Sequence, residues 1–226
     1  MLGKTVRNYN RKKFIMYSQN DEEKHILNKF SDKSDGVFLD IGAFDGRDLS
    51  NTLALAEKGW KGICVEGSSF SFSKLFAEHL RRDGVLLLNA IVTHEEVADK
   101  ERIVKFWESP NSAASTINRQ NYEKWKDRIQ GFGHGDFKEM FIPQVSLSEV
   151  LIWAKQTYPI IDFVNIDVEG GSTDLAMKFN PDEFKTTMMC IEHDGRYTEL
   201  VVHFAKWGFY PLSNNAENII LARTLS

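Results

Sequence analysis

The chain has 226 residues, enough for one large domain with a sizeable hydrophobic core. Its composition, 42% hydrophobic and 27% charged, is that of an ordinary globular protein. The formal net charge of −4 provides no general attraction to a phosphate backbone, so we do not expect nucleic acid to be the partner. No run of about 18 apolar residues is present, so we expect no membrane span and a cytoplasmic protein. The two cysteines have no spacing typical of a zinc site.

The first 35 residues are predicted to form a basic arm followed by a helix. Five basic residues and no acidic ones occur among residues 1–20: Lys4, Arg7, Arg11, Lys12 and Lys13. Apolar residues then recur at helical spacing between Asp21 and Phe30. We interpret the arm as a solvated tail rather than a nucleic-acid or membrane arm, and we expect the main domain to span 36–226.

Residues 37–92 alternate between strand and helix patterns. The apolar runs Val37–Ile41, Lys61–Glu66 and Val85–Val92 predict strands, the last one continuous and central in the sheet. Apolar spacing predicts helices over Asp48–Lys58 and from Phe72 to near Gly84. Strand, helix, strand, helix, strand is typical of a doubly wound α/β fold with a parallel sheet.

The regular pattern stops between residues 93 and 143. A strand over Ile103–Trp107, a loop at 109–115 and a short helix over Arg119–Ile129 are followed by the glycine-rich run Gly131–Gly135. Inserts between sheet elements often form lids or substrate walls, so we expect a lid-like insert at about 107–142.

After the insert, strands and helices alternate again. Helices are predicted over Leu147–Gln156, over Ser172–Phe179 and from Tyr197 to Gly208, with strands at Ile160–Ile166 and Thr187–Ile191 between them. The segments 209–212 and 218–222 are joined by a turn so short that they must pair antiparallel. Pro211 lacks a backbone donor, so its strand should lie at an edge.

A glycine-lined turn follows the first predicted strand. Asp40 ends this strand, and Gly42 and Gly46 come next, where glycines let backbone approach a ligand and a helix start offers unpaired N–H groups. Glu66 ends the second strand, the position where ribose hydroxyls are held in Rossmann-type sites. Together these residues predict a site for a nucleotide-like cofactor.

Four motifs of the chain resemble those of the FkbM family of S-adenosylmethionine-dependent methyltransferases. They are Phe-Leu-Asp-Ile-Gly-Ala-Phe-Asp-Gly (38–46), Val-Glu-Gly-Ser (65–68), Leu-Asn-Ala-Ile (88–91) and Asn-Ile-Asp-Val-Glu-Gly (165–170). The resemblance covers roughly residues 17–223. It implies a class I methyltransferase fold: a three-layer α/β/α domain with seven strands in the order 3-2-1-4-5-7-6, the seventh antiparallel. One departure is Gly67-Ser68, because the family usually has a proline after the acid.

The resemblance also implies roles for individual residues around bound S-adenosylmethionine. Asp40, Gly42, Ala43 and Gly46 would surround the methionine portion, and Glu66 would bind the ribose hydroxyls. The remaining cofactor contacts are expected from five residues: Gly67, Ser68, Asn89, Ala90 and Asp167.

Acidic residues and a histidine follow the fourth and fifth strands in the implied sheet order. Asp167 and Glu169 would lie beside the transferred methyl group, with His193 on the neighbouring strand. His193 or Asp167 is predicted to be the general base for a hydroxyl. In the alternative interpretation, Asp167 with Glu192 or Asp194 binds Mg²⁺, which would acidify the hydroxyl.

The sequence therefore predicts an O-methyltransferase that acts on a hydroxyl of a small molecule or a sugar. Three alternatives remain open at this point: a methyltransferase for nucleic-acid ribose or cap, an NAD-dependent oxidoreductase, and a non-catalytic binding module.

Overall fold

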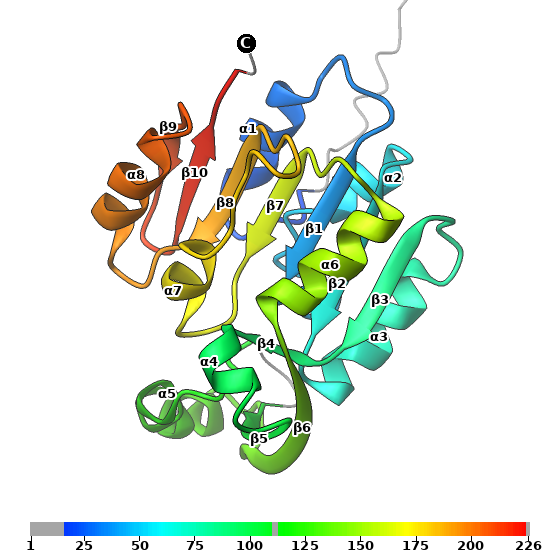
Figure 1. Cartoon of the computed structure of the whole chain (residues 1–226). Coiled ribbons are helices and arrows are strands. Elements are labelled where there is room, and N and C mark those ends of the chain that lie inside the picture. Colours follow the sequence, from blue (N-terminus) through cyan, green and yellow to red (C-terminus); the bar gives the residue numbers. More distant parts are fainter. Residues whose placement is uncertain (1–15, 110–112, 225–226) are drawn as a thin grey trace, which may run out of the picture.

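The computed structural model describes residues 16–109 and 113–224, and its centre is a seven-stranded sheet (Figure 1). The predicted basic arm therefore lies outside the described residues, as does the middle of the 109–115 loop. The order of the sheet is β3-β2-β1-β7-β8-β10-β9. Its strands are β1 (Val37–Ile41), β2 (Lys61–Glu66), β3 (Val85–Asn89), β7 (Phe163–Ile166), β8 (Met188–Glu192), β9 (Tyr210–Asn214) and β10 (Asn218–Ala222).

Most neighbouring strands in this sheet pair parallel, and only β10 pairs antiparallel with its neighbours. Numbered along the chain among themselves, the seven strands follow the order 3-2-1-4-5-7-6. The predicted antiparallel hairpin and the edge position of Pro211 are confirmed, since β9 is the last strand of the sheet. The sheet is thus mixed, and mostly parallel as the sequence predicted.

Helices cover both faces of the sheet. On one face α6 (Leu147–Thr157), α7 (Ser172–Ala176) and α8 (Tyr197–Ala205) pack against a core that includes Phe179 and Phe204. On the other face α1 (Glu22–Lys29), α2 (Leu53–Glu57) and α3 (Ser69–His79) pack against a second core around Phe38 and Trp60. This layering buries both faces of the parallel strands, which explains their continuous apolar sequences.

The strand order reverses beside β1. The chain passes from β1 to β2 and β3 on one side, and later returns to β7 and β8 on the other. Ile41 consequently lies between Val65 of β2 and Ile166 of β7. In open α/β sheets, ligands bind in the crevice that this reversal opens at the carboxyl ends of the strands.

The insert forms a small sheet of its own, in the order β4-β6-β5. It contains β4 (Ile91–Thr93), α4 (Glu95–Ala98), β5 (Ile103–Glu108), α5 (Arg119–Gly131) and β6 (Lys138–Ser146). Figure 1 shows these elements below the carboxyl ends of β1, β7 and β8. The expected insert at 107–142 is thus too narrow, because the small sheet already begins at β4.

Two predictions about the insert's borders are wrong. The continuous strand Val85–Val92 is divided, because β3 lies at the edge of the main sheet while β4 pairs with β6. Strand β6 was not predicted, and it contains Pro143, which has no backbone N–H to donate. The missing N–H falls where β6 changes partner: Pro143 pairs with Ile103 of β5, and the next residue pairs with Ile91 of β4.

The predicted helix at 48–58 begins five residues late, at Leu53. Local hydrogen bonds occupy the backbone before it: Asp45 accepts from the backbone N–H groups of Arg47 and Asp48, at 2.9 and 2.8 Å. Ser50 then accepts from the N–H of Leu53 at 3.0 Å. Such short side-chain bonds compete with helix formation.

In the part of the chain that the structure describes, no helix has both the length and the apolar character needed to cross a membrane.

Candidate functional site

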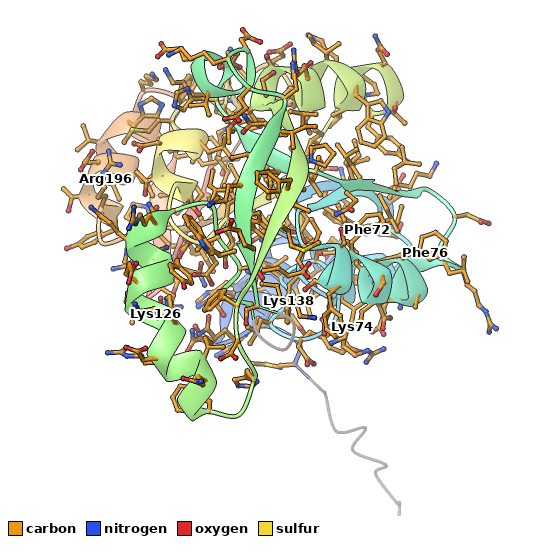
Figure 2. All side chains as sticks on the ribbon, turned by 90° about the horizontal axis from the view of Figure 1, so that it is seen from below. Phe72, Lys74, Phe76, Lys126, Lys138 and Arg196 are labelled. Atoms are coloured by element: carbon orange, nitrogen blue, oxygen red, sulfur yellow. The ribbon has the colours of Figure 1, made fainter. Side chains whose placement is uncertain are left out.

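A cavity of about 1100 Å³ opens at the carboxyl ends of β1, β2, β7 and β8. The insert forms its opposite wall, with residues of β4 and α5 lining it. Figure 2 looks at this end of the molecule and shows α5, with Lys126, and the β5–β6 pair between Arg196 on one side and α3, with Phe72 and Phe76, on the other. The cavity volume is at the upper end of the ~300–1000 Å³ range typical of sites for small ligands and cofactors.

Backbone strain is concentrated around this cavity. Four non-glycine residues that line it have left-handed φ angles: Phe44 (51°), Leu49 (61°), Glu169 (54°) and Asp194 (50°). This conformation is uncommon for residues other than glycine, asparagine and aspartate. Strained residues tend to cluster at functional sites, where the surrounding structure holds them in place.

A buried polar network lies at the end of β1. Asp40 accepts hydrogen bonds from Thr52 Oγ1 at 2.6 Å and from Asn165 Nδ2 at 2.9 Å. Asn165 therefore turns its amide oxygen to Asn51, whose Nδ2 donates to it at 3.0 Å. This fixes the orientation of Asn51 and leaves its buried Oδ1 without a hydrogen-bond partner among the described residues. Burial also raises the pKa of Asp40.

Gly42 and Gly46 have different roles. Gly42 lines the cavity with a φ of +87°, and a Cβ there would come within 1.6 Å of the backbone oxygen of Asp167. Only glycine lets the two strand-end loops touch at this point. Gly46 does not line the cavity, although it was predicted to bind the cofactor; it closes the turn against Leu75 of α3.

Glu66 is held at the end of β2 by two backbone donors. Its Oε2 accepts from Phe44 N at 2.9 Å, and its Oε1 accepts from Ser68 N at 2.6 Å. Burial raises the pKa of Glu66 to about 7, against the opposing effect of these two donors. Each oxygen keeps an acceptor position, so the carboxylate can bind two further donors.

The wall beside Glu66 differs from the prediction at two residues. Asn89 does not line the cavity; its Nδ2 donates to the backbone oxygens of Glu66 and Gly67, at 2.7 and 3.1 Å. Ser68 does not line it either, because it caps α3 by accepting from Ser71 N at 3.1 Å. Gly67 and Ala90 do line the cavity, as does Ala43 on the β1 side.

Asp167 and Glu192, which follow β7 and β8, are hydrogen-bonded to each other through their side chains. Two carboxyl groups can make this bond only if one of them carries a proton. Burial and the charge of Glu192 raise the pKa of Asp167 well above its ordinary value. Glu192 also accepts from Ser172 Oγ at 2.6 Å, which favours its charged form. These effects favour the protonated form on Asp167 rather than on Glu192.

Glu169 lies next to this pair and has a raised pKa of about 8. Burial is the largest cause, followed by repulsion from Glu192, while Lys124 of α5 opposes the shift. The insert holds its backbone: the carbonyl oxygen of Glu169 accepts from Thr116 Oγ1 and from Asn121 Nδ2, each at 2.7 Å. These contacts fix the left-handed conformation that directs the residue into the cavity.

His193 is buried and does not line the cavity. Its Nδ1 accepts from Gly195 N at 2.9 Å, and its Nε2 lies 3.1 Å from the carbonyl oxygen of Asn215. Because an N–H can only donate, Nδ1 is the acceptor and the ring proton is on Nε2. Both ring nitrogens are thus occupied, and the structure does not bring His193 to the site as a base.

The carboxylates of the magnesium alternative are already bound to protein groups. Glu192 accepts from Ser172, and Asp194 Oδ2 accepts from Thr173 N at 3.2 Å. Within residues 16–109 and 113–224, no group of three or more acidic, histidine or cysteine side chains is arranged to hold a metal ion.

Several site residues had no predicted role. Asn165 belongs to the motif at 165–170, but the sequence alone indicates no role for it. Its hydrogen bond to Asp40 follows from the pairing of the two residues on β7 and β1. Ser50 stands three residues before Leu53, and a serine at that spacing is a cap signal that could have marked the loop that carries Asn51. Nothing local marks Thr116, Asn121 or Lys124, because the insert reaches Glu169 only through the tertiary fold.

Comparisons with known proteins establish no family for this chain. No family model matches it, and no curated protein shows a significant match. One matching solved structure is a protein of Methanococcus maripaludis, proposed to be an S-adenosyl-L-methionine-dependent methyltransferase. It is 10% identical, with a TM-score of 0.33, over 90% of this chain and 84% of that one. We draw no conclusion from so low a score.

Proposed function

We propose that this protein is an S-adenosylmethionine-dependent O-methyltransferase that acts on a hydroxyl group of a small molecule or a sugar. The proposal rests on Glu66, a carboxylate fixed at the end of β2 with one acceptor position free on each oxygen. A carboxylate held in this way suits the two adjacent hydroxyls of a ribose. It lies beside the Gly42 turn, because it accepts from the N–H of Phe44 in that turn, and α/β folds of this kind bind nucleotides there.

The residues around the crevice fit the rest of the cofactor. The unpartnered Asn51 Oδ1, beside Asp40, offers an acceptor for the ammonium group of the methionine portion. Gly42 and Ala43 would lie along that portion, and Gly67 and Ala90 along the adenine. When bound, the cofactor would supply a methyl group on a positively charged sulfur, near Asp167.

Glu169 is our candidate for the general base. Its pKa of about 8 is near the operating pH, as proton transfer requires. Glu169 would accept the proton of the acceptor hydroxyl as its oxygen is methylated; the cofactor would supply the methyl group, and its sulfur would keep the electron pair of the carbon–sulfur bond. The protonated form is favoured on Asp167, which is hydrogen-bonded to Glu192, so its proposed role is to line the cofactor side of the site.

The charged side chains that line the cavity argue against a nucleic-acid methyltransferase. Among the described residues, nine carboxyl side chains line the cavity, against two basic side chains, Lys124 and Arg196. Arg196 is already paired with Asp174 at 2.6 Å and with Glu199 at 2.7 Å. Phosphate groups are bound by concentrations of lysine and arginine, the reverse of this arrangement.

Calorimetry with S-adenosylmethionine, S-adenosylhomocysteine and NAD tests the cofactor. We expect both adenosyl compounds to bind and NAD not to. Glu66→Ala should weaken their binding by roughly 1.5–3 kcal/mol, the range for hydrogen bonds to a charged group. Glu96→Ala, an exposed acid outside the cavity, is the matched control and should bind normally. Tight binding of NAD alone would refute the proposal in favour of an oxidoreductase.

A further inference from the structure

The cavity extends well past the proposed cofactor residues. We call the part bordered by Glu169, Glu192, Asp194, Glu217 and Asn218 the acidic lobe. Along the sheet edge the order is β1, β7, β8, β10, and Asn218 pairs with Glu192. Three strand intervals of about 4.8 Å place Asn218 roughly 14 Å from β1. A second molecule beside the cofactor would therefore occupy the acidic lobe.

Positive charge from the protein is scarce in this lobe. Repulsion from Glu192, Glu217 and Asp194 acts on Glu169, and among the described residues Lys124 opposes it. Arg196 also lines the cavity, but its ion pairs with Asp174 and Glu199 already offset its charge. The acidic side chains of the lobe thus outnumber the basic side chains of the described residues that lie near them.

Asn218 provides an independent sign of a ligand. Its side chain is 4% exposed, and its Nδ2 donates to Glu22 at 3.1 Å. Glu22 also accepts from Asn215 Nδ2 at 2.7 Å. Because a carboxylate accepts hydrogen bonds, the side-chain amide of Asn218 must point its nitrogen, and not its oxygen, toward Glu22. Glu22 does not line the cavity whereas Asn218 does, and the buried Oδ1 of Asn218 has no hydrogen-bond partner in the described chain. An unpaired buried acceptor is costly unless a ligand donates to it.

We propose that the acidic lobe binds a methyl acceptor that carries a protonated amine beside its hydroxyl, as an amino sugar or an amino alcohol does. The inference rests on the proposed function. An ammonium group has three donors, which suit Asn218 Oδ1 and the carboxylates of Glu217 and Asp194. Its charge offsets the acids, and the neighbouring hydroxyl would then lie toward Glu169. A neutral sugar supplies donors without this charge, and an anionic acceptor would be repelled.

The test measures binding of four amines, glucosamine, galactosamine, ethanolamine and serinol, against their N-acetyl derivatives. Calorimetry is done with the whole chain saturated with S-adenosylhomocysteine. We expect at least one amine to bind at least tenfold more tightly than its N-acetyl derivative. The double variant Asp194→Asn/Glu217→Gln should weaken that amine by roughly 5- to 20-fold, because two partly exposed charges are lost. Asparagine tolerates the left-handed backbone at 194 and can still accept from Thr173 N.

The matched control is Asp83→Asn/Glu96→Gln, which removes two exposed acids outside the cavity and should leave amine binding unchanged. If S-adenosylhomocysteine binds but no amine exceeds its N-acetyl derivative, the inference is overturned and the proposed function stands. Equal weakening by the lobe and control variants would also overturn it. If S-adenosylhomocysteine itself does not bind, the proposed function fails.

Discussion

Replacing Glu169 with glutamine should remove activity while stabilising the protein at alkaline pH. The substitution keeps the size of the side chain and removes the carboxylate that we propose as the base. General-base catalysis contributes about 10²- to 10⁴-fold, so we expect a loss of that size in kcat. With a pKa of about 8, roughly 9% of Glu169 is ionised at pH 7 and half at pH 8. The wild-type rate should therefore rise about fivefold over this interval.

The effect on stability follows from the raised pKa. Below about pH 4.5 the carboxyl group is protonated in the folded and the unfolded chain, and contributes nothing. Between about pH 4.5 and 8 the unfolded chain releases the proton while the folded chain keeps it, so the wild type loses stability as the pH rises. The span from 4.5 to about 8 corresponds to at most ~4.8 kcal/mol. Glu169 is partly exposed, and its repulsion is shared with neighbouring acids, so we expect the loss in the free energy of unfolding to be about 1–2 kcal/mol.

Thermal unfolding at pH 5 and pH 8 measures this effect. For a chain of this size, about 1–2 kcal/mol corresponds to roughly 2–8 °C in Tm. Glu169→Gln should unfold at about the same temperature as the wild type at pH 5, and at a higher one at pH 8. A variant that keeps more than a tenth of the wild-type kcat would remove Glu169 as the base. A Tm difference that is the same at both pH values would refute the assigned pKa.

Three further predictions address the surroundings of Glu169. Thr116→Val removes the hydroxyl that holds the Glu169 carbonyl and should lower kcat about tenfold; Thr186→Val removes an equally buried hydroxyl bond far from the cavity and should lower Tm only. His193→Ala should cost about 1–3 kcal/mol of stability through its two ring hydrogen bonds and reduce kcat less than threefold, whereas a hundredfold loss would restore it as the base. At pH 7, binding of S-adenosylmethionine should release more protons than binding of S-adenosylhomocysteine, because its positive sulfur lowers the pKa values of Asp167 and Glu169. Calorimetry in buffers of different ionisation enthalpy measures this release, and equal values for the two compounds would contradict the assignment.

The sequence by itself determined the elements that depend on local patterns. The bounds of β1, β2 and β10 match the predicted segments, because unbroken apolar runs end at turns or glycines there. The positions of Asp40 and Glu66 at strand ends followed from the same runs, and so did the antiparallel hairpin. These features need only neighbours in the chain, and local propensity and burial favour the same structure.

Only the tertiary structure decided how the strand ends and the insert meet. The chain leaves the main sheet at Ala90 because β4 pairs with β6, about fifty residues later in the chain. No local sequence signal marks this change from one sheet to the other. The roles of the predicted acids were decided in the same way. Burial and the neighbouring Glu192 raise the pKa of Asp167, which favours its protonated form. Asn121 of the insert positions Glu169 by donating to its carbonyl oxygen. His193 is excluded by its hydrogen bond to Asn215. Protonation state and orientation depend on burial and on partners distant in the chain, which no local pattern contains.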